Sequence, residues 1–284
     1  MKLTFITDEA SQDPAAFIAL ANKLSLDSVE LRTVSGKHIS DFNAVERREL
    51  KSRLDDGDLS VCCIGSPVFK CDLASNPEDE IDKLEKALDA AAYFGSPLVR
   101  IFSFWRKEDR DRYLDEVTER LMSAGEVAKP SGITLAIENG KRTMHATGAE
   151  LASLLEALDQ QVFRALWDPG NSIYGRTDPD PVSNGYPLIA KWVSHVHIKD
   201  PAVYSDGSRR YVEIGRGQLD LRRQIDALNA NGYSGYASLE THWRPERVMS
   251  EGELDYPGGE SFSKSGYEAT EQCLVKLGQL LQVD

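Results

Sequence analysis

Residues 77–102 read PEDEIDKLEKALDAAAYFGSPLVRIF, and this stretch contains the unit from which the chain is built. Its first part, residues 77–95, is amphipathic: it begins with acidic residues and ends at a glycine. A helix N-terminus favours negative charge and a helix C-cap favours glycine. An apolar, β-rich run, PLVRIF, follows at once. The stretch therefore predicts an α-helix that leads directly into a β-strand.

Apolar runs of this kind recur eight times, at intervals of about 25 to 42 residues, the size of a strand plus a crossover helix. They are LTFI, SVELR, SVCCIG, PLVRIF, ITLAIE, FRALWD, WVSHVHI and GYASLE, which begin at residues 3, 28, 60, 97, 133, 163, 192 and 235. Alternating strands and helices form a parallel sheet, and eight such units close into a barrel. We therefore predict an α/β fold, a single-domain (β/α)8 TIM barrel over residues 1–284. No GxGxxG follows the first strand, which argues against a doubly wound dinucleotide-binding sheet.

Composition excludes several classes of protein. With 41% apolar and 28% charged residues, the chain is neither disordered nor collagen-like. Its net charge of −13 disfavours nucleic acid as a partner, since that affinity depends on cations. No run approaches the roughly 18 apolar residues of a membrane helix. The four cysteines show no CxxC spacing. We expect a cytoplasmic protein with reduced thiols.

Polar side chains close the last four apolar runs. Glu138, Asp168 and Glu240 end the fifth, sixth and eighth runs, and the seventh carries His195 and His197. In a barrel of this kind the active site lies at the C-terminal ends of the strands. Because side chains alternate between the two faces of a strand, the two histidines share the face that points to the barrel axis. We therefore expect these groups to meet at the barrel mouth.

Three carboxylates gathered at the barrel mouth would repel one another, and at least one would stay protonated unless a cation lay among them. Glu138, Asp168, His197 and Glu240 offer three oxygens and one nitrogen, which suit Mn²⁺, Mg²⁺, Co²⁺ or Zn²⁺. The simpler alternative is that each carboxylate caps a helix or pairs with an arginine. Four such groups on four consecutive strands favour one divalent metal ion.

Five motifs occur in a fixed order at or after these strand ends. They are AIENG (136–140), WDPGNS (167–172), HVHIKD (195–200), GRGQLD (215–220) and SLETHW (238–243). With these motifs the chain resembles, over essentially its whole length, the xylose isomerase-like, or sugar phosphate isomerase/epimerase, TIM barrels. The resemblance implies metal ligation by Glu138, Asp168, His197 and Glu240. By similarity to ketose 3-epimerases it further implies that the two glutamates act as opposed acid and base.

The sequence departs from the ketose 3-epimerase pattern at two positions. Asn171 stands where those enzymes have a histidine three residues after the aspartate. Val203 stands where they have an arginine six residues after the metal-binding histidine. The resemblance therefore supports the superfamily more strongly than it supports epimerisation.

Six further residues near the predicted strand ends are candidates for binding the substrate. They are Arg32, Trp105, His145, Asn171, His195 and Lys199. For most of them a structural role is an equally simple interpretation. Asn171 also suits a turn or a helix N-cap, and Lys199 can reach solvent at the rim.

The deeper candidates also have structural alternatives. His195 lies one layer below His197 and also suits the core, and His145 also suits a rim loop. Arg32 also fits a buried ion cluster. Trp105 is placed to cover the apolar face of a sugar, although rim aromatic residues often serve only packing.

The predicted chemistry is proton transfer next to the carbonyl of a small carbohydrate or polyol. The leading version is a metal-dependent sugar isomerase or epimerase in which Glu138 and Glu240 act as base and acid through an enediolate. A dehydratase of a polyol or keto-inositol substrate would use the same enolate to expel a hydroxyl. An endonuclease acting at abasic DNA sites and a non-catalytic binding barrel are the weaker alternatives.

The one irregular stretch, residues 244–266, is rich in Pro, Gly, Ser and charge. It follows the eighth strand and precedes the last predicted helix, so we expect a long loop at the catalytic rim. A lid over the active site, a contact in a homo-oligomer and a plain surface loop all fit this composition.

Overall fold

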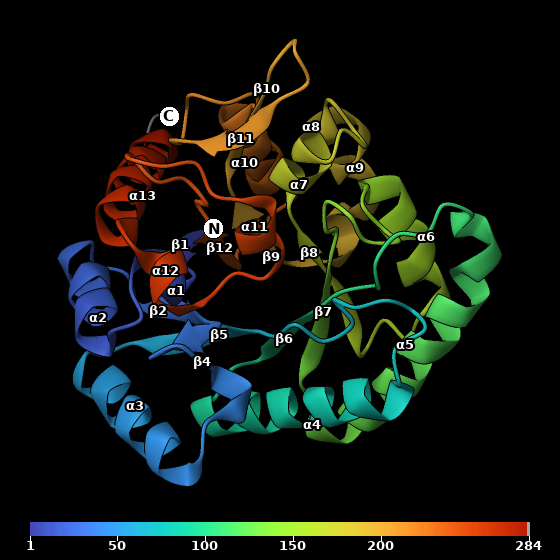
Figure 1. The fold of residues 1–284 in the computed structure, drawn as a ribbon, viewed down its shortest axis with the longest axis horizontal. Helices are drawn as coiled ribbons and strands as arrows, with labels where there is room; N and C mark the ends of the chain where they lie inside the picture. The colour runs from blue at the N-terminus through green and yellow to red at the C-terminus, as the bar shows by residue number, and fades with distance from the viewer. Residues whose placement is uncertain (283–284) are drawn as a thin grey trace.

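The computed structural model of the protein describes residues 1–282 and shows eight parallel strands in a barrel surrounded by helices (Figure 1). The strands are β1 Lys2–Phe5, β2 Ser28–Leu31, β5 Ser60–Gly65, β6 Leu98–Ile101, β7 Thr134–Glu138, β8 Phe163–Trp167, β9 Val193–Ile198 and β12 Tyr236–Leu239. Their order in the sheet is β1-β12-β9-β8-β7-β6-β5-β2. A parallel bridge between Ile6 and Glu30 brings the two edge strands together, so that the barrel is nearly closed. The predicted (β/α)8 barrel is confirmed.

Helices form the outer ring (Figure 1). The longer ones are α2 Pro14–Lys23, α3 Ala44–Asp56, α4 Pro77–Phe94, α5 Leu114–Ala128, α6 Gly148–Ala157, α10 Leu221–Ala230 and α13 Gly266–Gln282. α4 ends as the sequence predicts, because Gly95 adopts a left-handed φ of 72° at its C-cap. In the part of the chain that the structure describes, no helix has both the length and the apolar character needed to cross a bilayer.

Short elements fill the connections. The short helices are α1 Thr7–Ala10, α7 Pro169–Tyr174, α8 Pro181–Asn184, α9 Tyr186–Ile189, α11 Glu251–Asp255 and α12 Gly259–Ser263, and 3₁₀ turns span Ile39–Asp41, Arg110–Tyr113, Lys129–Ser131 and Ala190–Trp192. Two hairpins, β3 Thr33–Val34 with β4 Lys37–His38 and β10 Asp200–Val203 with β11 Arg209–Val212, follow β2 and β9. Neither hairpin is visible as a pattern in the sequence.

The segment 244–266 is more ordered than the long loop that we expected. It contains α11 and α12, which lie over the barrel in Figure 1. A capping box starts α11, in which the Ser250 hydroxyl accepts from the Glu253 amide and the Glu253 carboxylate accepts from the Ser250 amide. Sequence analysis missed these helices because each is only five residues long and shows no apolar periodicity.

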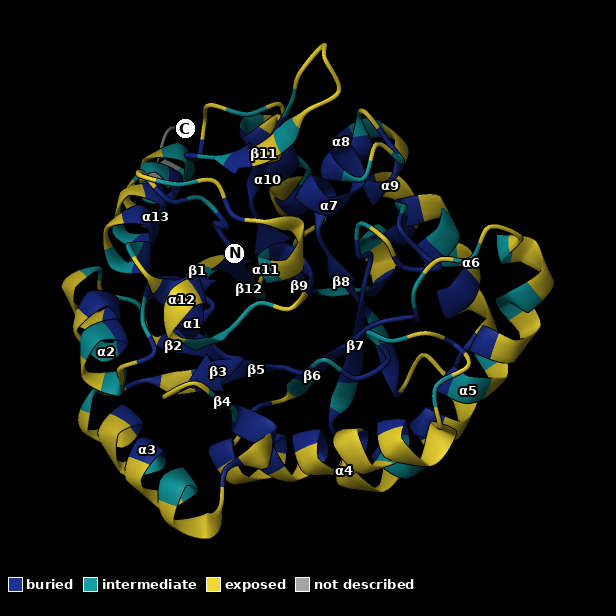
Figure 2. Cartoon of the chain, in the orientation of Figure 1, coloured by how far each residue is buried: buried dark blue, intermediate teal, exposed yellow. Residues whose placement is uncertain are grey.

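The apolar core lies between the strands and the helices, not inside the barrel. Outward-facing strand residues that belong to this core include Val29, Leu31, Ile64, Val99, Ile101, Leu135, Ile137, Trp167, Val196, Ile198 and Leu239. Their neighbours along the same strands, such as Glu30, Arg100, His195 and His197, are also buried. Since side chains alternate across a strand, these polar groups point into the barrel. Figure 2 accordingly shows buried strands and helices with one buried and one exposed face.

We expect the Leu135→Ala substitution on β7 to lower the free energy of unfolding by about 2–5 kcal/mol, because the fully buried leucine would leave a cavity in the core. Leu188→Ala is the matched control, since Leu188 is 50% exposed and its loss should cost less than about 0.5 kcal/mol. Urea denaturation followed by circular dichroism measures both. Equal losses in the two variants would contradict this location of the core.

Candidate active site

Four side chains from four consecutive barrel strands converge at the mouth. Glu138 ends β7, Asp168 follows β8, His197 lies on β9 and Glu240 follows β12. Each offers one donor atom, these atoms lie within 4.8 Å of one another, and all four residues are buried. The local fold explains why Asp168 is held in place: it is the N-cap of α7 and accepts from the Asn171 amide at 3.0 Å.

His197 is oriented by a carboxylate from the opposite side of the barrel. Its Nε2 lies 3.1 and 3.2 Å from the two oxygens of Glu30 on β2. The other ring nitrogen, Nδ1, then faces Glu138 Oε2 at 3.8 Å and Glu240 Oε2 at 3.5 Å. A carboxylate that accepts from one ring nitrogen so that the other is free for a cation is the usual arrangement behind a metal-binding histidine.

The donor set fits a divalent cation on two observations. Within residues 1–282, Glu138 Oε2 and His197 Nδ1 are buried and accept or donate no hydrogen bond. Burial, together with the negative charges of Glu138 and Glu240, raises the pKa of Asp168 to about 6 despite the nearby Lys199 ammonium. The cluster is therefore short of positive charge, as the sequence argument expected, and a cation would correct this.

Glu240 is held much more tightly than Glu138. Its Oε1 accepts from Arg32 Nη1 at 2.6 Å, and its Oε2 contacts the Lys199 ammonium. The same ammonium lies 2.6 Å from Asp168 Oδ2. Among residues 1–282, Glu138 accepts a hydrogen bond only from Asn171 Nδ2, at 2.7 Å, while Arg100 lies 3.4 Å from its second oxygen. The two glutamates therefore have different electrostatic surroundings.

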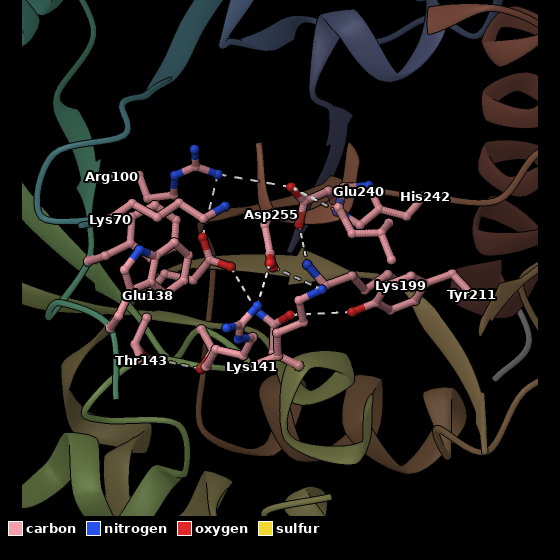
Figure 3. Close-up of a pocket in the computed structure, with 16 residues that line it drawn as sticks. Lys70, Arg100, Glu138, Lys141, Thr143, Lys199, Tyr211, Glu240, His242 and Asp255 are labelled. Atoms are coloured by element: carbon pink, nitrogen blue, oxygen red, sulfur yellow. Dashed lines mark hydrogen bonds and ion pairs between the residues drawn. The ribbon is translucent and has the colours of Figure 1, made fainter. Parts of the chain in front are cut away.

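Glu138, Glu240, Asn171 and Lys199 border a small cavity of about 30 Å³, room for roughly one or two water molecules. Figure 3 shows Lys70, Arg100 and Glu138 on one side and Lys199, Tyr211 and Glu240 on the other. The full lining consists of Lys70, Arg100, Phe102, Trp105, Glu138, Gly140, Lys141, Arg142, Thr143, Asn171, Lys199, Tyr211, Glu240, His242, Leu254 and Asp255. Leu254 and Asp255 come from α11, so the segment 244–266 forms part of the wall.

Three of the six residues expected to bind substrate line this cavity. They are Trp105, Asn171 and Lys199. Trp105 meets Tyr256 edge-on with ring centroids 6.3 Å apart. Asn171 holds Glu138, and Lys199 bridges Asp168 and Glu240. These three residues border the cavity, and their role in binding the substrate stays a prediction.

The other three residues lie away from the cavity wall. Arg32 is buried behind Glu240, where its guanidinium also binds Asp8 and Glu9. His195 Nε2 lies 2.9 Å from both Glu30 Oε2 and Ser238 Oγ. Arg32 and His195 therefore belong to a buried polar network, which is the structural role that the sequence also allowed.

His145 is also buried without reaching the cavity. Burial and the charge of Arg110 lower its pKa to about 3, so its ring is neutral. Its Nδ1 has no hydrogen-bond partner among the described residues. The structure therefore places His145 under the rim. Among residues 1–282 it forms no hydrogen bond or ion pair with any of the four converging side chains.

Several cavity residues are not among the predicted site residues, and three of them are Lys70, Tyr211 and His242. His242 had a signal, since it lies two residues after Glu240. Its backbone is left-handed (φ 47°), and Glu9 holds both its amide, at 3.1 Å, and its Nδ1, at 2.7 Å. Tyr211 lies in the hairpin β10–β11 and Lys70 in an aperiodic loop, so neither was recognisable from strand parity.

Comparisons with known proteins agree with this fold. The family model described as "Xylose isomerase-like TIM barrel" matches residues 18–260. An inosose dehydratase from Clostridium perfringens is 26% identical over 143 residues, which are 45% of this chain and 47% of that protein. The chain thus matches about half the length of this curated relative.

Solved structures share the whole barrel. The IOLI protein with a binding zinc atom has a TM-score of 0.76 at 16% identity, covering 99% of this chain and 98% of that one. L-ribulose 3-epimerase has a TM-score of 0.75 at 19% identity, covering 99% and 95%. At these identities the similarity shows the fold.

Asp168→Asn is expected to lower the metal content of the purified protein, because it removes one of three anionic oxygen donors from the converging set. Asp255→Asn is the matched control: Asp255 lines the same cavity but lies outside that set. Elemental analysis gives the metal-to-protein ratio. An unchanged ratio in Asp168→Asn would contradict its role as a ligand.

Glu30→Gln should weaken metal affinity by about 10- to 100-fold, since the carboxylate that orients His197 loses its charge. Ser238→Ala removes a hydroxyl that donates to the same carboxylate at 2.7 Å without changing any charge, so its effect should be smaller. Competition with a chelating dye measures both affinities. Equal affinities in Glu30→Gln and the wild type would show that Glu30 does not orient the histidine.

Proposed function

Because the chain belongs to the xylose isomerase-like TIM barrel family, we propose that it is a divalent-metal-dependent enzyme acting on a small polyhydroxylated carbonyl compound. The reaction begins with removal of a carbon-bound proton next to the carbonyl. The observation that carries this proposal is the convergence of donor atoms of Glu138, Asp168, His197 and Glu240 within 4.8 Å, at a cavity that Glu138 and Glu240 line. The three carboxylates and one imidazole suit Mn²⁺, Mg²⁺, Co²⁺ or Zn²⁺.

These four residues would hold the ion, and Glu30 would keep His197 in the orientation that ligation needs. A divalent ion bound there supplies Lewis-acid stabilisation of the negative charge that develops on a carbonyl oxygen. Lys199, whose ammonium already neutralises Asp168 and Glu240, adds a further positive charge at the cavity wall. All four residues and Lys199 are buried, which strengthens these interactions.

Glu138 is the better base of the two glutamates. Its Oε2 is buried and accepts no hydrogen bond among the described residues, while Asn171 fixes Oε1. Burial alone would raise the pKa of Glu240, but the charges of Lys199 and the neighbouring histidines hold it well below its usual range. Glu240 therefore stays ionised and is a poor proton donor.

Because Glu138 is the suitable base and Glu240 is a poor proton donor, elimination is favoured over proton transfer between two opposed glutamates. Glu138 removes the proton from the carbon next to the carbonyl, and the electrons of that C–H bond form an enolate. The enolate then expels the β-hydroxyl, which takes back the proton from Glu138 and leaves as water, so that an unsaturated ketone remains. The curated relative described as an inosose dehydratase supports this outcome.

Isomerisation or epimerisation is the second candidate. It is favoured by the position of Glu138 and Glu240, which border one cavity from β7 and β12. Protonation at Glu240 would require it to leave Lys199 and Arg32, which makes this route slower. Both outcomes share the first proton removal.

Glu138→Gln should slow exchange of solvent deuterium into an inosose by about 10²- to 10⁴-fold, the usual contribution of a positioned base. Glu240→Gln should retain more exchange, and Glu260→Gln, at an exposed position on α12, should behave as the wild type. Nuclear magnetic resonance follows the exchange, and ultraviolet absorbance follows formation of the conjugated ketone.

A panel containing an inosose, an aldose and a ketose distinguishes the two outcomes. Conjugated ketone without isomerised sugar supports elimination, and isomerised sugar without conjugated ketone supports the second candidate. Undiminished exchange in Glu138→Gln would overturn the assignment of the base.

A further inference from the structure

Lys70 is fixed at the cavity by a strained loop. It follows β5, and the residue before it, Phe69, has a left-handed φ of 59°. Three backbone hydrogen bonds of 2.8–2.9 Å join Val68, Phe69 and Cys71 to residues 102, 104 and 105 of the loop after β6. Phe104 is also left-handed (φ 62°), and its ring packs on that of Phe69 with centroids 4.9 Å apart. Backbone strain of this kind is commonly found at functional sites.

The ammonium of Lys70 has no hydrogen bond or ion pair within residues 1–282; its described contacts are aromatic. It lies 4.9 Å from the ring centre of Phe102 and 6.0 Å from that of Trp105. Figure 3 shows it beside Arg100 and Glu138 on one side of the pocket. Lys70 therefore differs from every other cation of the lining, since each of those has a carboxylate partner.

The partners of the other cations are all described. Arg100 pairs with Glu138, and Lys199 pairs with Asp168 and Glu240. Lys141 and Arg142 both pair with Asp255, at 3.1 and 2.7 Å. Five cationic side chains and three carboxylates thus line the cavity of a protein with net charge −13. Because Lys70 alone among these cations has no carboxylate partner within residues 1–282, its charge is the one available to attract an anion.

We propose that Lys70 anchors a carboxylate group of the substrate, so that the enzyme acts on a polyhydroxylated carbonyl acid in preference to a neutral compound. This inference rests on the proposed function, since the carboxylate belongs to the compound that loses the proton. Phosphate is the less suitable anion, because phosphate sites use several backbone amides at a helix N-terminus, and Lys70 is a single point charge. Arg100 borders the same position and adds to the attraction.

The surroundings of Lys70 also predict how this binding depends on pH. The charged or titratable groups that face it are Arg32 after β2, His38 on β4, Arg100 on β6, Glu138 on β7 and Glu240 after β12. Burial and the charge of Arg100 lower the pKa of Lys70 to about 7. His38, with its pKa lowered to about 4, stays neutral above that pH. Carboxylate affinity should therefore fall as pH rises above about 7, where the amine becomes neutral.

The test is equilibrium binding of D-glycerate, glycerol and sn-glycerol 3-phosphate to the metal-loaded enzyme, measured by isothermal titration calorimetry. Lys70→Met should weaken D-glycerate binding at least tenfold, about 1.4 kcal/mol, and leave glycerol binding unchanged. Lys70→Arg should restore D-glycerate binding and remove its decline between pH 7 and 9, since arginine stays charged. Thermal unfolding confirms that both variants are folded.

Equal D-glycerate affinities in the wild type and Lys70→Met would overturn the inference. Tighter binding of sn-glycerol 3-phosphate, with a larger loss in Lys70→Met, would replace the carboxylate by a phosphate and overturn it as stated. Both results leave proton removal by Glu138 untouched. Conversely, a wild type that prefers D-glycerate but never exchanges deuterium would overturn the proposed reaction and retain the anion site.

Discussion

The carboxylate of Glu30 is the interaction on which the barrel interior depends. It lies on β2, yet its partners His195, His197 and Ser238 belong to β9 and β12, which are not neighbours of β2 in the sheet. The same residue forms the bridge to Ile6 that brings the edge strands together. One side chain therefore links barrel closure to the orientation of the histidine at the mouth. A buried carboxylate is tolerated because His195, His197 and Ser238 all lie within hydrogen-bond distance of it.

A second group of buried charged residues gives Glu138 and Glu240 different surroundings. Arg32 joins Asp8 and Glu9 to Glu240, and Glu9 in turn holds His242 and Arg244. Removing one member would leave an uncompensated buried charge, which is why such networks are costly to alter. The network surrounds Glu240 with cations and leaves Glu138 with a single amide donor and Arg100 at 3.4 Å. The different roles proposed for the two glutamates thus originate in residues that lie behind the cavity wall.

Sequence analysis predicted the features that follow from strand periodicity. The eight strands, the helix at residues 77–94 and the convergence of side chains at strand ends all depend on alternation and on the barrel's geometry. Lys70 could not be found this way, because its position depends on the left-handed backbone of Phe69 and on pairing with a loop about 35 residues away. The place of Arg32 depends on Asp8 and Glu9, which no local pattern connects to it. Pairing between loops that are far apart in the chain is not predicted by local sequence patterns.

The segment that covers the cavity has an apolar cluster of its own. Met249, Leu254 and Phe262 pack with Tyr174 and Tyr211, apart from the main core of the barrel. Ion pairs from Asp255 to Lys141 and Arg142 fasten its inner side. The same segment is fastened to the barrel elsewhere, since Glu251 pairs with Lys141 and the Ser263 hydroxyl donates to the carbonyl of Asp8. The width of the cavity mouth therefore depends on contacts near both ends of the segment.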